Sequence, residues 1–157
     1  MQEDEGDQKN EKQRQKYRRE IAIRDVERPI NTEHSIEKEI QWICQCLGFS
    51  DDGNDIATDI FKELLRATRG REGITTSEIV EKEKPTRNIT QGAVVYHLNI
   101  FIQRGVVIKE GRKYYLRSSR LDETIDEIEQ DMLRRMKKMR ELAKHIDEEL
   151  DRMMNEI

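Results

Sequence analysis

The stretch ITQGAVVYHLNIFIQRGVV, residues 89–107, decides how the rest of the chain is organised. Apolar side chains recur in it at helical spacing, which predicts a helix with one face covered by other elements. These side chains are Val94, Leu98, Phe101 and Ile102. Gly105 predicts the end of that helix, and the residues after it begin a short apolar strand. Polar residues are left for another face: Thr90, Gln91, His97, Asn99 and Gln103.

Before this stretch, a helix is expected over residues 31–47. Asn31 or Thr32 can cap its start, and Gly48 supplies a left-handed stop at its end. Its apolar stripe would consist of Ile36, Ile40, Ile43 and Leu47. Trp42 lies off that stripe, so it should pack against another element or a second subunit.

Two shorter helices are expected between Gly48 and the opening stretch. Apolar periodicity predicts one of them over residues 55–68. The capping-box spacing of Thr75 and Glu78 predicts the other over residues 76–83, and Ile74 can add a short edge strand before it.

A β-hairpin is predicted after Gly105. Residues 106–109 and 113–117 read as two strands joined around Gly111, and glycine at such a turn favours a hairpin. The expected fold class is therefore mainly α with a small β-hairpin.

One long helix is predicted over residues 121–155, roughly 50 Å long at 1.5 Å per residue. Its apolar residues step by three or four and the other positions are mostly charged, so the stripe needs a partner helix. The same helix of a second copy is the simplest partner, in a regular coiled coil or a helical bundle. The alternative is folding back onto the helix at 31–47. The expected dimer-interface residues are Ile125, Ile128, Met132, Met136, Met139, Ile146, Leu150 and Met153.

Composition limits the classes of protein to which the chain can belong. Charged residues are 39% of the 157 residues and hydrophobic ones 34%, so much of the chain should be exposed helix or tail. No apolar run approaches the ~20 residues of a membrane span, and the N-terminus has no secretory apolar region, so a cytoplasmic location is expected. Cys44 and Cys46 are expected to be ordinary buried or half-buried thiols.

Charge is uneven along the chain, although its net value is only −4. Residues 9–28 hold eight Lys and Arg against four acids, and residues 84–120 hold eight against one, so phosphate partners would be met there. Residues 1–30 are expected to form a solvated tail or an arm that orders on a phosphate backbone or a partner surface. The arm's candidate contacts are Arg14, Lys16, Arg18 and Arg19.

No arrangement of residues for catalysis is evident in the sequence. Gly-rich phosphate loops are absent, and His34, His97 and His145 lie far apart without acidic ligands at metal-binding spacing. The chain is not expected to be an enzyme, and neither a metal nor another cofactor is expected.

The opening stretch combines a polar start, the run YHL at 96–98 and the closing run GVV at 105–107. In these features it resembles the recognition helix of winged helix-turn-helix proteins of the ArsR kind, in an archaeal-type form with a C-terminal dimerisation helix. The resemblance implies a helical extension and winged-helix domain over residues 31–120, followed by a coiled-coil-like dimerisation helix at 121–157.

The resemblance also implies contact with nucleic acid. The turn, helix start and wing place several residues where phosphates would be met: Lys84, Arg87, Thr90, Gln91, Lys109, Arg112 and Lys113. Base reading would fall to Gln91, Tyr96 and Asn99.

The start of the helix departs from the ArsR-like pattern. It presents Gly92, Ala93, Val95 and Tyr96 where small hydroxyls and a basic residue are common, so only Gln91 among the early positions can make a bidentate base contact. Such a face would equally suit a protein partner, a shape-read RNA surface or weakly specific DNA binding. The metal-sensing residues of some ArsR members are absent, so no inducer is implied.

Two functions are therefore expected, both of them without catalysis. The first is a homodimeric, DNA-binding transcription regulator. The second is a ribosome-associated factor that binds rRNA and ribosomal protein of the small subunit, and bridges two particles or blocks subunit association. Dimeric winged-helix factors of archaea that bind small ribosomal subunits are similar in this layout. A protein-interaction scaffold is a third possibility.

Overall fold

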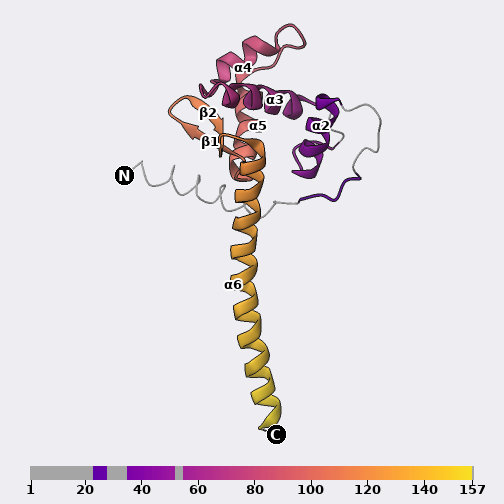
Figure 1. Ribbon diagram of the computed structural model, residues 1–157, viewed down its shortest axis with the longest axis vertical. Coiled ribbons are helices and arrows are strands. Elements are labelled where there is room, and N and C mark those ends of the chain that lie inside the picture. Colours follow the sequence, from indigo (N-terminus) through magenta and orange to yellow (C-terminus); the bar gives the residue numbers. More distant parts are fainter. Residues whose placement is uncertain (1–22, 28–34, 52–54, 157) are drawn as a thin grey trace.

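The computed structural model describes residues 23–27, 35–51 and 55–156, and it confirms the expected fold class (Figure 1). These residues form five helices, of which the C-terminal one is long, and one antiparallel hairpin. In chain order the elements are α2 (Ile36–Cys46), α3 (Ile56–Arg69), α4 (Thr76–Glu83), α5 (Gln91–Gln103), β1 (Val107–Glu110), β2 (Lys113–Leu116) and α6 (Leu121–Asn155).

Three helices begin where a short polar side chain caps a backbone amide. Asp55 accepts from the amide of Thr58 at 3.1 Å at the start of α3, and Thr90 accepts from Ala93 at 3.1 Å at the start of α5. At the start of α4, Thr75 accepts from the amide of Glu78 at 3.2 Å. Each bond satisfies an amide that has no partner within its helix, which is why these helices start where the sequence predicts, to within a residue or two.

The hairpin pairs β1 with β2 in antiparallel register, with Val107 opposite Leu116 and Glu110 opposite Lys113. Ile74 forms an isolated bridge to Tyr114, donating to its carbonyl at 3.0 Å and accepting from its amide at 2.8 Å. The edge strand expected at Ile74 is thus present only as an isolated bridge. It ties the loop between α3 and α4 to the outer side of β2.

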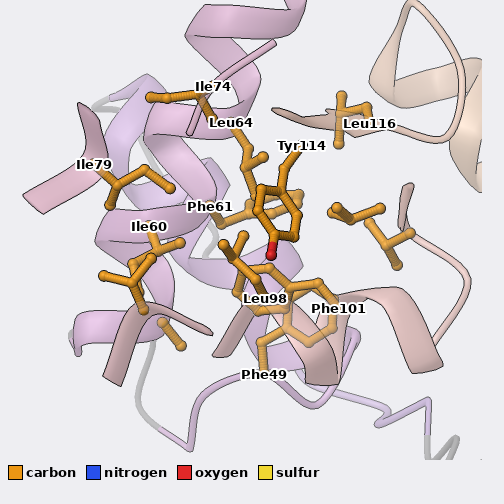
Figure 2. Packing of buried hydrophobic residues seen from close by; sticks show 14 of the residues in the cluster. Phe49, Ile60, Phe61, Leu64, Ile74, Ile79, Leu98, Phe101, Tyr114 and Leu116 are labelled. Carbon is orange, nitrogen blue, oxygen red and sulfur yellow. The ribbon is translucent and has the colours of Figure 1, made fainter. Parts of the chain in front are cut away.

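A single hydrophobic core lies between α3, α5 and the hairpin (Figure 2). Three aromatic rings form its centre: the Phe49 ring lies 5.7 Å from that of Phe61 and 4.3 Å from that of Phe101. Tyr114 reaches into the same cluster from β2. The buried hydroxyl of Thr68 accepts from the amide of Leu116 at 3.1 Å, so α3 and β2 are also joined by a hydrogen bond.

Helix α2 starts later than expected and buries fewer apolar residues. Asn31 and Thr32, the expected caps, lie outside the described residues; the structure gives Ser35 as the N-cap. Ile36 is 74% exposed, so its place in the buried stripe was wrong. The chain turns into α2 at this point, and no element covers Ile36 within the part of the chain that the structure describes. The expected buried thiol is confirmed in Cys44.

Residues 23–27 lie along α2. The amide of Arg24 donates to the carbonyl of Cys46 at 2.9 Å, and its guanidinium pairs with Asp51 at 2.8 Å. The indole of Trp42 donates to the carbonyl of Val26 at 3.1 Å, which explains why this residue lies off the apolar stripe. This short segment of the expected arm therefore contacts the domain rather than extending away from it.

Helix α6 begins against the domain and then projects away from it (Figure 1). Its first turns carry Ile125, Ile128 and Met132, which pack against the core. Beyond them the apolar residues are exposed by about half or more: Leu133, Met136, Met139, Leu142, Ile146, Leu150, Met153 and Met154. The outer helix does not fold back onto α2, so that alternative is wrong. The uncovered stripe begins after Met132, later than the apolar pattern alone predicts.

Candidate nucleic-acid interface

The outer face of α5 is exposed and carries no charged side chain. Gln91, Val95 and Asn99 line it at four-residue spacing, with Gly92 and Tyr96 beside them. Tyr96 is 59% exposed and Val95 36%. This surface can offer an amide, a phenol and apolar area to a partner, but it offers no cation to a phosphate.

Two residues at the start of α5 already have partners within the chain. The hydroxyl of Thr90 caps the helix, so its predicted phosphate contact would compete with the cap. The amide nitrogen of Gln91 lies 3.3 Å from the hydroxyl of Ser77 on α4. Ser77 is exposed and was missed by the sequence reasoning, because nothing in the local pattern of α4 indicates that it faces α5. The pair connects the two helices of the candidate helix-turn-helix at their outer surface.

The basic residues of the turn before α5 are also paired. Arg87 binds Asp59 of α3 at 2.7 Å and is only 34% exposed in its side chain. Lys84 pairs with Glu81 at 2.7 Å on the surface of α4. Arg87 therefore holds the turn against α3, and it has less freedom to contact a phosphate than its position in the sequence suggests.

A group of carboxylates explains why Arg87 is held at this place. Glu63 and Glu83 are buried residues near Asp59. Burial raises the pKa of Glu83, and the neighbouring charges of Asp59 and Glu63 raise it further, while Arg87 opposes them. Lys82 and Arg66 also approach Glu63, at 4.0 and 2.9 Å. The group consists of ion pairs that join α3, α4 and the turn.

The hairpin presents the cations that α5 lacks. Lys109, Arg112 and Lys113 are all exposed, and no ion pair joins any of them to another described residue. The ammonium of Lys109 lies 5.5 Å from the centre of the Tyr114 ring. The Gly111 turn between the strands keeps the tip of the hairpin narrow. These side chains are the strongest candidates for phosphate contact in the described part of the chain.

His97 packs beside Tyr96 on α5. It is half-buried on α5 with its ring 5.2 Å from that of Tyr96, and burial lowers its pKa, so it is neutral at physiological pH. No group of three or more possible ligands that could hold a metal ion occurs among the described residues. Arg14, Lys16, Arg18 and Arg19 lie outside those residues, so the arm's predicted contacts stay predictions.

A basic groove at the junction of α5 and α6 was not predicted from the sequence. It has a volume of about 380 Å³, and basic side chains from both helices line it. These are Arg104, Arg134, Arg135 and Lys138. Asp131, which also lines the groove, pairs with Arg117 and Arg134, so part of its positive charge is compensated.

None of the described helices is both long and apolar enough to cross a membrane. Comparison of the chain with models of known families, with curated proteins and with solved structures finds no match.

Proposed function

We propose that the chain is a homodimeric winged-helix protein that binds DNA and regulates transcription. The order of α3, the Ile74 bridge, α4, α5 and the hairpin is compatible with a winged helix-turn-helix of the ArsR-like kind. The observation that carries the proposal is that uncharged and cationic side chains lie on separate, neighbouring parts of the surface. An exposed, uncharged face of α5 is followed directly by a hairpin whose three cations have no ionic partner among the described residues.

In this proposal α5 enters the major groove and the hairpin acts as the wing. Lys109, Arg112 and Lys113 bind phosphates beside the groove, which supplies affinity that depends on salt but carries no sequence information. Gln91 and Asn99 read base edges, and Tyr96 contributes a hydroxyl and apolar area. Gln91 gives up its 3.3 Å bond to Ser77 on binding, a long bond that costs little to exchange.

Paired mutations test the DNA-binding surface after genomic fragments have been selected on the purified protein. Gln91→Ala with Asn99→Ala should lose preference for the selected fragment and keep salt-sensitive binding to random DNA. Replacing Lys109, Arg112 and Lys113 by Ala should weaken binding to the selected fragment and to random DNA alike. It should also reduce the slope of log affinity against log salt concentration by roughly 0.9 per lost phosphate contact. Gln130→Ala, an exposed glutamine of α6, is the matched control. A selected fragment that the Gln91 and Asn99 variant binds unchanged would count against base reading by α5.

The dimer in this proposal forms through the exposed stripe of α6. Half-exposed Met, Leu and Ile side chains on a projecting helix favour a partner that removes them from water. Met139→Glu with Leu150→Glu should yield a monomer by light scattering, because each places a charge in the stripe. His145→Glu with Asn155→Glu adds the same charge off the stripe and should stay dimeric. Met132→Glu is a poorer choice, since Met132 also packs against the core.

The apolar part of the α5 surface also suits a second function, binding to the small ribosomal subunit. Exposed Val95 and Tyr96 suit an RNA surface read by shape, or a ribosomal protein, and the basic segment 9–28 would add phosphate contacts. A dimer could then bridge two particles. Deleting residues 1–28 would abolish ribosome binding, and Val95→Asp with Tyr96→Ala would weaken it, while Gln91→Ala would not.

A pull-down from native lysate without nuclease separates the two functions. The nucleic acid in the captured material is sequenced and its proteins are identified. A defined promoter fragment supports the regulator, and rRNA with small-subunit proteins supports the ribosome factor. Recovery of neither nucleic acid, with a protein partner lost in the Val95→Asp, Tyr96→Ala variant, would support a protein-interaction scaffold and reject both.

A further inference from the structure

The outer part of α6 changes the sign of its charge along its length. Residues 133–145 hold six Lys and Arg against one acid, whereas residues 146–156 hold five acids against one Arg. Both blocks belong to the exposed, projecting part of the helix (Figure 1), and the apolar stripe runs through both. A helix that pairs with a copy of itself must therefore place each block beside the same block or beside the opposite one.

We infer that two copies pair along α6 in antiparallel orientation, with the two-fold axis between residues 144 and 145. The inference rests on the homodimer proposed above and adds its geometry. In a parallel, in-register pair the basic blocks would lie side by side, and so would the acidic blocks, which is unfavourable. In the antiparallel pair each basic block lies along the acidic block of the second copy. Charge thus selects the orientation.

The apolar stripe fits this axis layer by layer. From Met132 onward the stripe follows a regular alternation of four and three residues, the spacing of core positions in a coiled coil. An axis between residues 144 and 145 brings each core residue opposite another core residue of the second copy. The layers are Met136 with Met153, Met139 with Leu150, and Ala143 with Ile146. The small Ala143 then lies against the larger Ile146 instead of another alanine, which fills the layer better.

The residues beside the core give the same result. Arg140 and Asp147 occupy equivalent flanking positions, and in the antiparallel pair Arg140 of one copy approaches Asp147 of the other, twice by symmetry. Leu133 and Met154, both exposed in the single chain, meet in the same way and extend the apolar contact. In a parallel pair Arg140 would instead approach Arg135.

The basic groove beside the first part of α6 is also complementary in charge to the acidic block of the second copy. Arg134, Arg135 and Lys138 line it on the α6 side, next to the domain. The antiparallel arrangement brings the acidic block of the second copy, residues 146–156, to this end of the helix. The two domains then lie at opposite ends of the paired helices, with their Met132 residues about 38 Å apart along the axis at 1.5 Å per residue.

A charge swap tests the orientation in the full-length protein. Arg140→Glu alone and Asp147→Arg alone should each weaken the dimer about tenfold, since each turns two attractive pairs into repulsive ones. The double variant should recover most of the wild-type affinity. Lys138→Glu and Asp151→Arg make the same charge changes at outward positions and should have much smaller effects. Additive weakening in the Arg140 and Asp147 double variant would overturn the antiparallel pairing.

Disulfide cross-linking gives a second readout that does not depend on affinity. Met136→Cys and Met153→Cys are made on a Cys46→Ser background; Cys44 is fully buried and stays. Oxidation should link a mixture of the two variants and leave each variant alone unlinked, because equal positions lie about 26 Å apart or more along an antiparallel pair. Linkage of each variant to itself means a parallel dimer and overturns this inference alone. A monomer by light scattering overturns the homodimer as well, while DNA or ribosome binding by the domain remains a separate measurement.

Discussion

The charge of Glu83 is disfavoured by its surroundings in the folded domain. This residue is buried near Asp59 and Glu63, and only Arg87 and Lys62 oppose the resulting rise in its pKa. A carboxyl group with a raised folded pKa favours folding most below its unfolded pKa, near 4.5, and this contribution is lost as pH rises through the folded pKa. Attraction to Arg87 and Lys62 offsets part of the cost of ionising Glu83.

Replacing Glu83 by Gln should therefore change the pH dependence of unfolding. At pH 4 the carboxyl is mostly protonated in both states, so the variant and the wild type should have similar urea midpoints. At pH 7 the variant should be at least as stable as the wild type, because it removes the repulsion with Asp59 and Glu63. Glu81→Gln, at an exposed residue paired only with Lys84, is the control. A variant that is clearly less stable at pH 7 and unchanged at pH 4 would show that the Arg87 attraction dominates.

Two glycines with nearly the same backbone angle provide a test of packing at a single residue. Gly73 has φ +64° and Gly111 has φ +62°, both in the left-handed region that disfavours other residues. A Cβ at Gly73 would lie 2.5 Å from the Tyr115 ring, whereas one at Gly111 would meet nothing within 4 Å. An alanine would therefore meet the same backbone penalty at both positions, but a steric clash only at Gly73.

Gly111→Ala should destabilise the chain by about 1 kcal/mol, the cost of the left-handed conformation for an L residue. Gly73→Ala should cost about 1 to 3 kcal/mol more, because Tyr115 must move out of its place. Urea unfolding of both variants measures the difference. Tyr115→Ala in the Gly73→Ala background should recover part of the excess. Equal effects of the two glycine substitutions would mean that Tyr115 moves aside without cost.

Among the elements, α6 depends on Arg117 for its connection to the hairpin. The guanidinium binds Glu127 at 2.7 Å and Asp131 at 2.5 Å, both on the first turns of the helix. The buried hydroxyl of Thr124 donates to the carbonyl of Arg120 at 2.9 Å and accepts from the amide of Ser118 at 3.2 Å. These bonds fix the direction in which the helix leaves the domain, and hence where a second domain would lie in a dimer.

Arg117→Ala should weaken the attachment of residues 121–132 of α6 to the domain without unfolding the domain. Hydrogen exchange should quicken across residues 121–132, and stability should fall by roughly 1 to 2 kcal/mol, since Glu127 loses the Arg117 cation and Asp131 keeps only Arg134. Arg120→Ala removes an exposed pair with Asp122 only, and should change little. The Arg117 bond also lowers the pKa of Asp131, so this ion pair stabilises the folded state at neutral pH. The stabilisation should vanish as the pH falls below 3.8 and through the lowered pKa of Asp131 in the folded state. Unchanged exchange across residues 121–132 would mean that Ile128 and Leu121 hold the helix without Arg117.

The sequence predicted those elements whose signals are local. The predicted bounds of α4 and α6 agree with the structure because their signals are local: the Thr75 cap directly before α4, and the apolar stripe along α6. Ile36 was wrongly placed in the core because burial depends on which distant elements come close. In the same way Arg87 looked available for phosphate, but its partner Asp59 lies on another helix. Lys109, Arg112 and Lys113 do lie on an exposed hairpin, as predicted, and their contact with nucleic acid is a proposal.

At the scale of the whole molecule, the proposed dimer is two domains joined by a rod. An antiparallel rod keeps the domains at its ends, so the two α5 surfaces cannot meet one another, and each is left to its own partner. This arrangement is compatible with two separated DNA sites and with two ribosomal particles. The distance between sites that one dimer can occupy would then be set by the length of α6.

The dependence of dimerisation on salt follows from the same charge pattern. Salt shortens the range of electrostatic attraction, from about 14 Å at 0.05 M to about 4 Å at 0.5 M by the usual scaling. The antiparallel dimer, which pairs opposite blocks, should therefore dissociate several-fold more readily at 0.5 M NaCl than at 0.05 M. A parallel dimer, which pairs like blocks, would become tighter. Analytical ultracentrifugation of the full chain measures the sign directly. The Arg140→Glu, Asp147→Arg double variant should, like the wild type, dissociate more readily at high salt. Arg140→Glu alone should show a smaller or opposite dependence on salt, because salt screens the repulsion that this variant introduces beside the core.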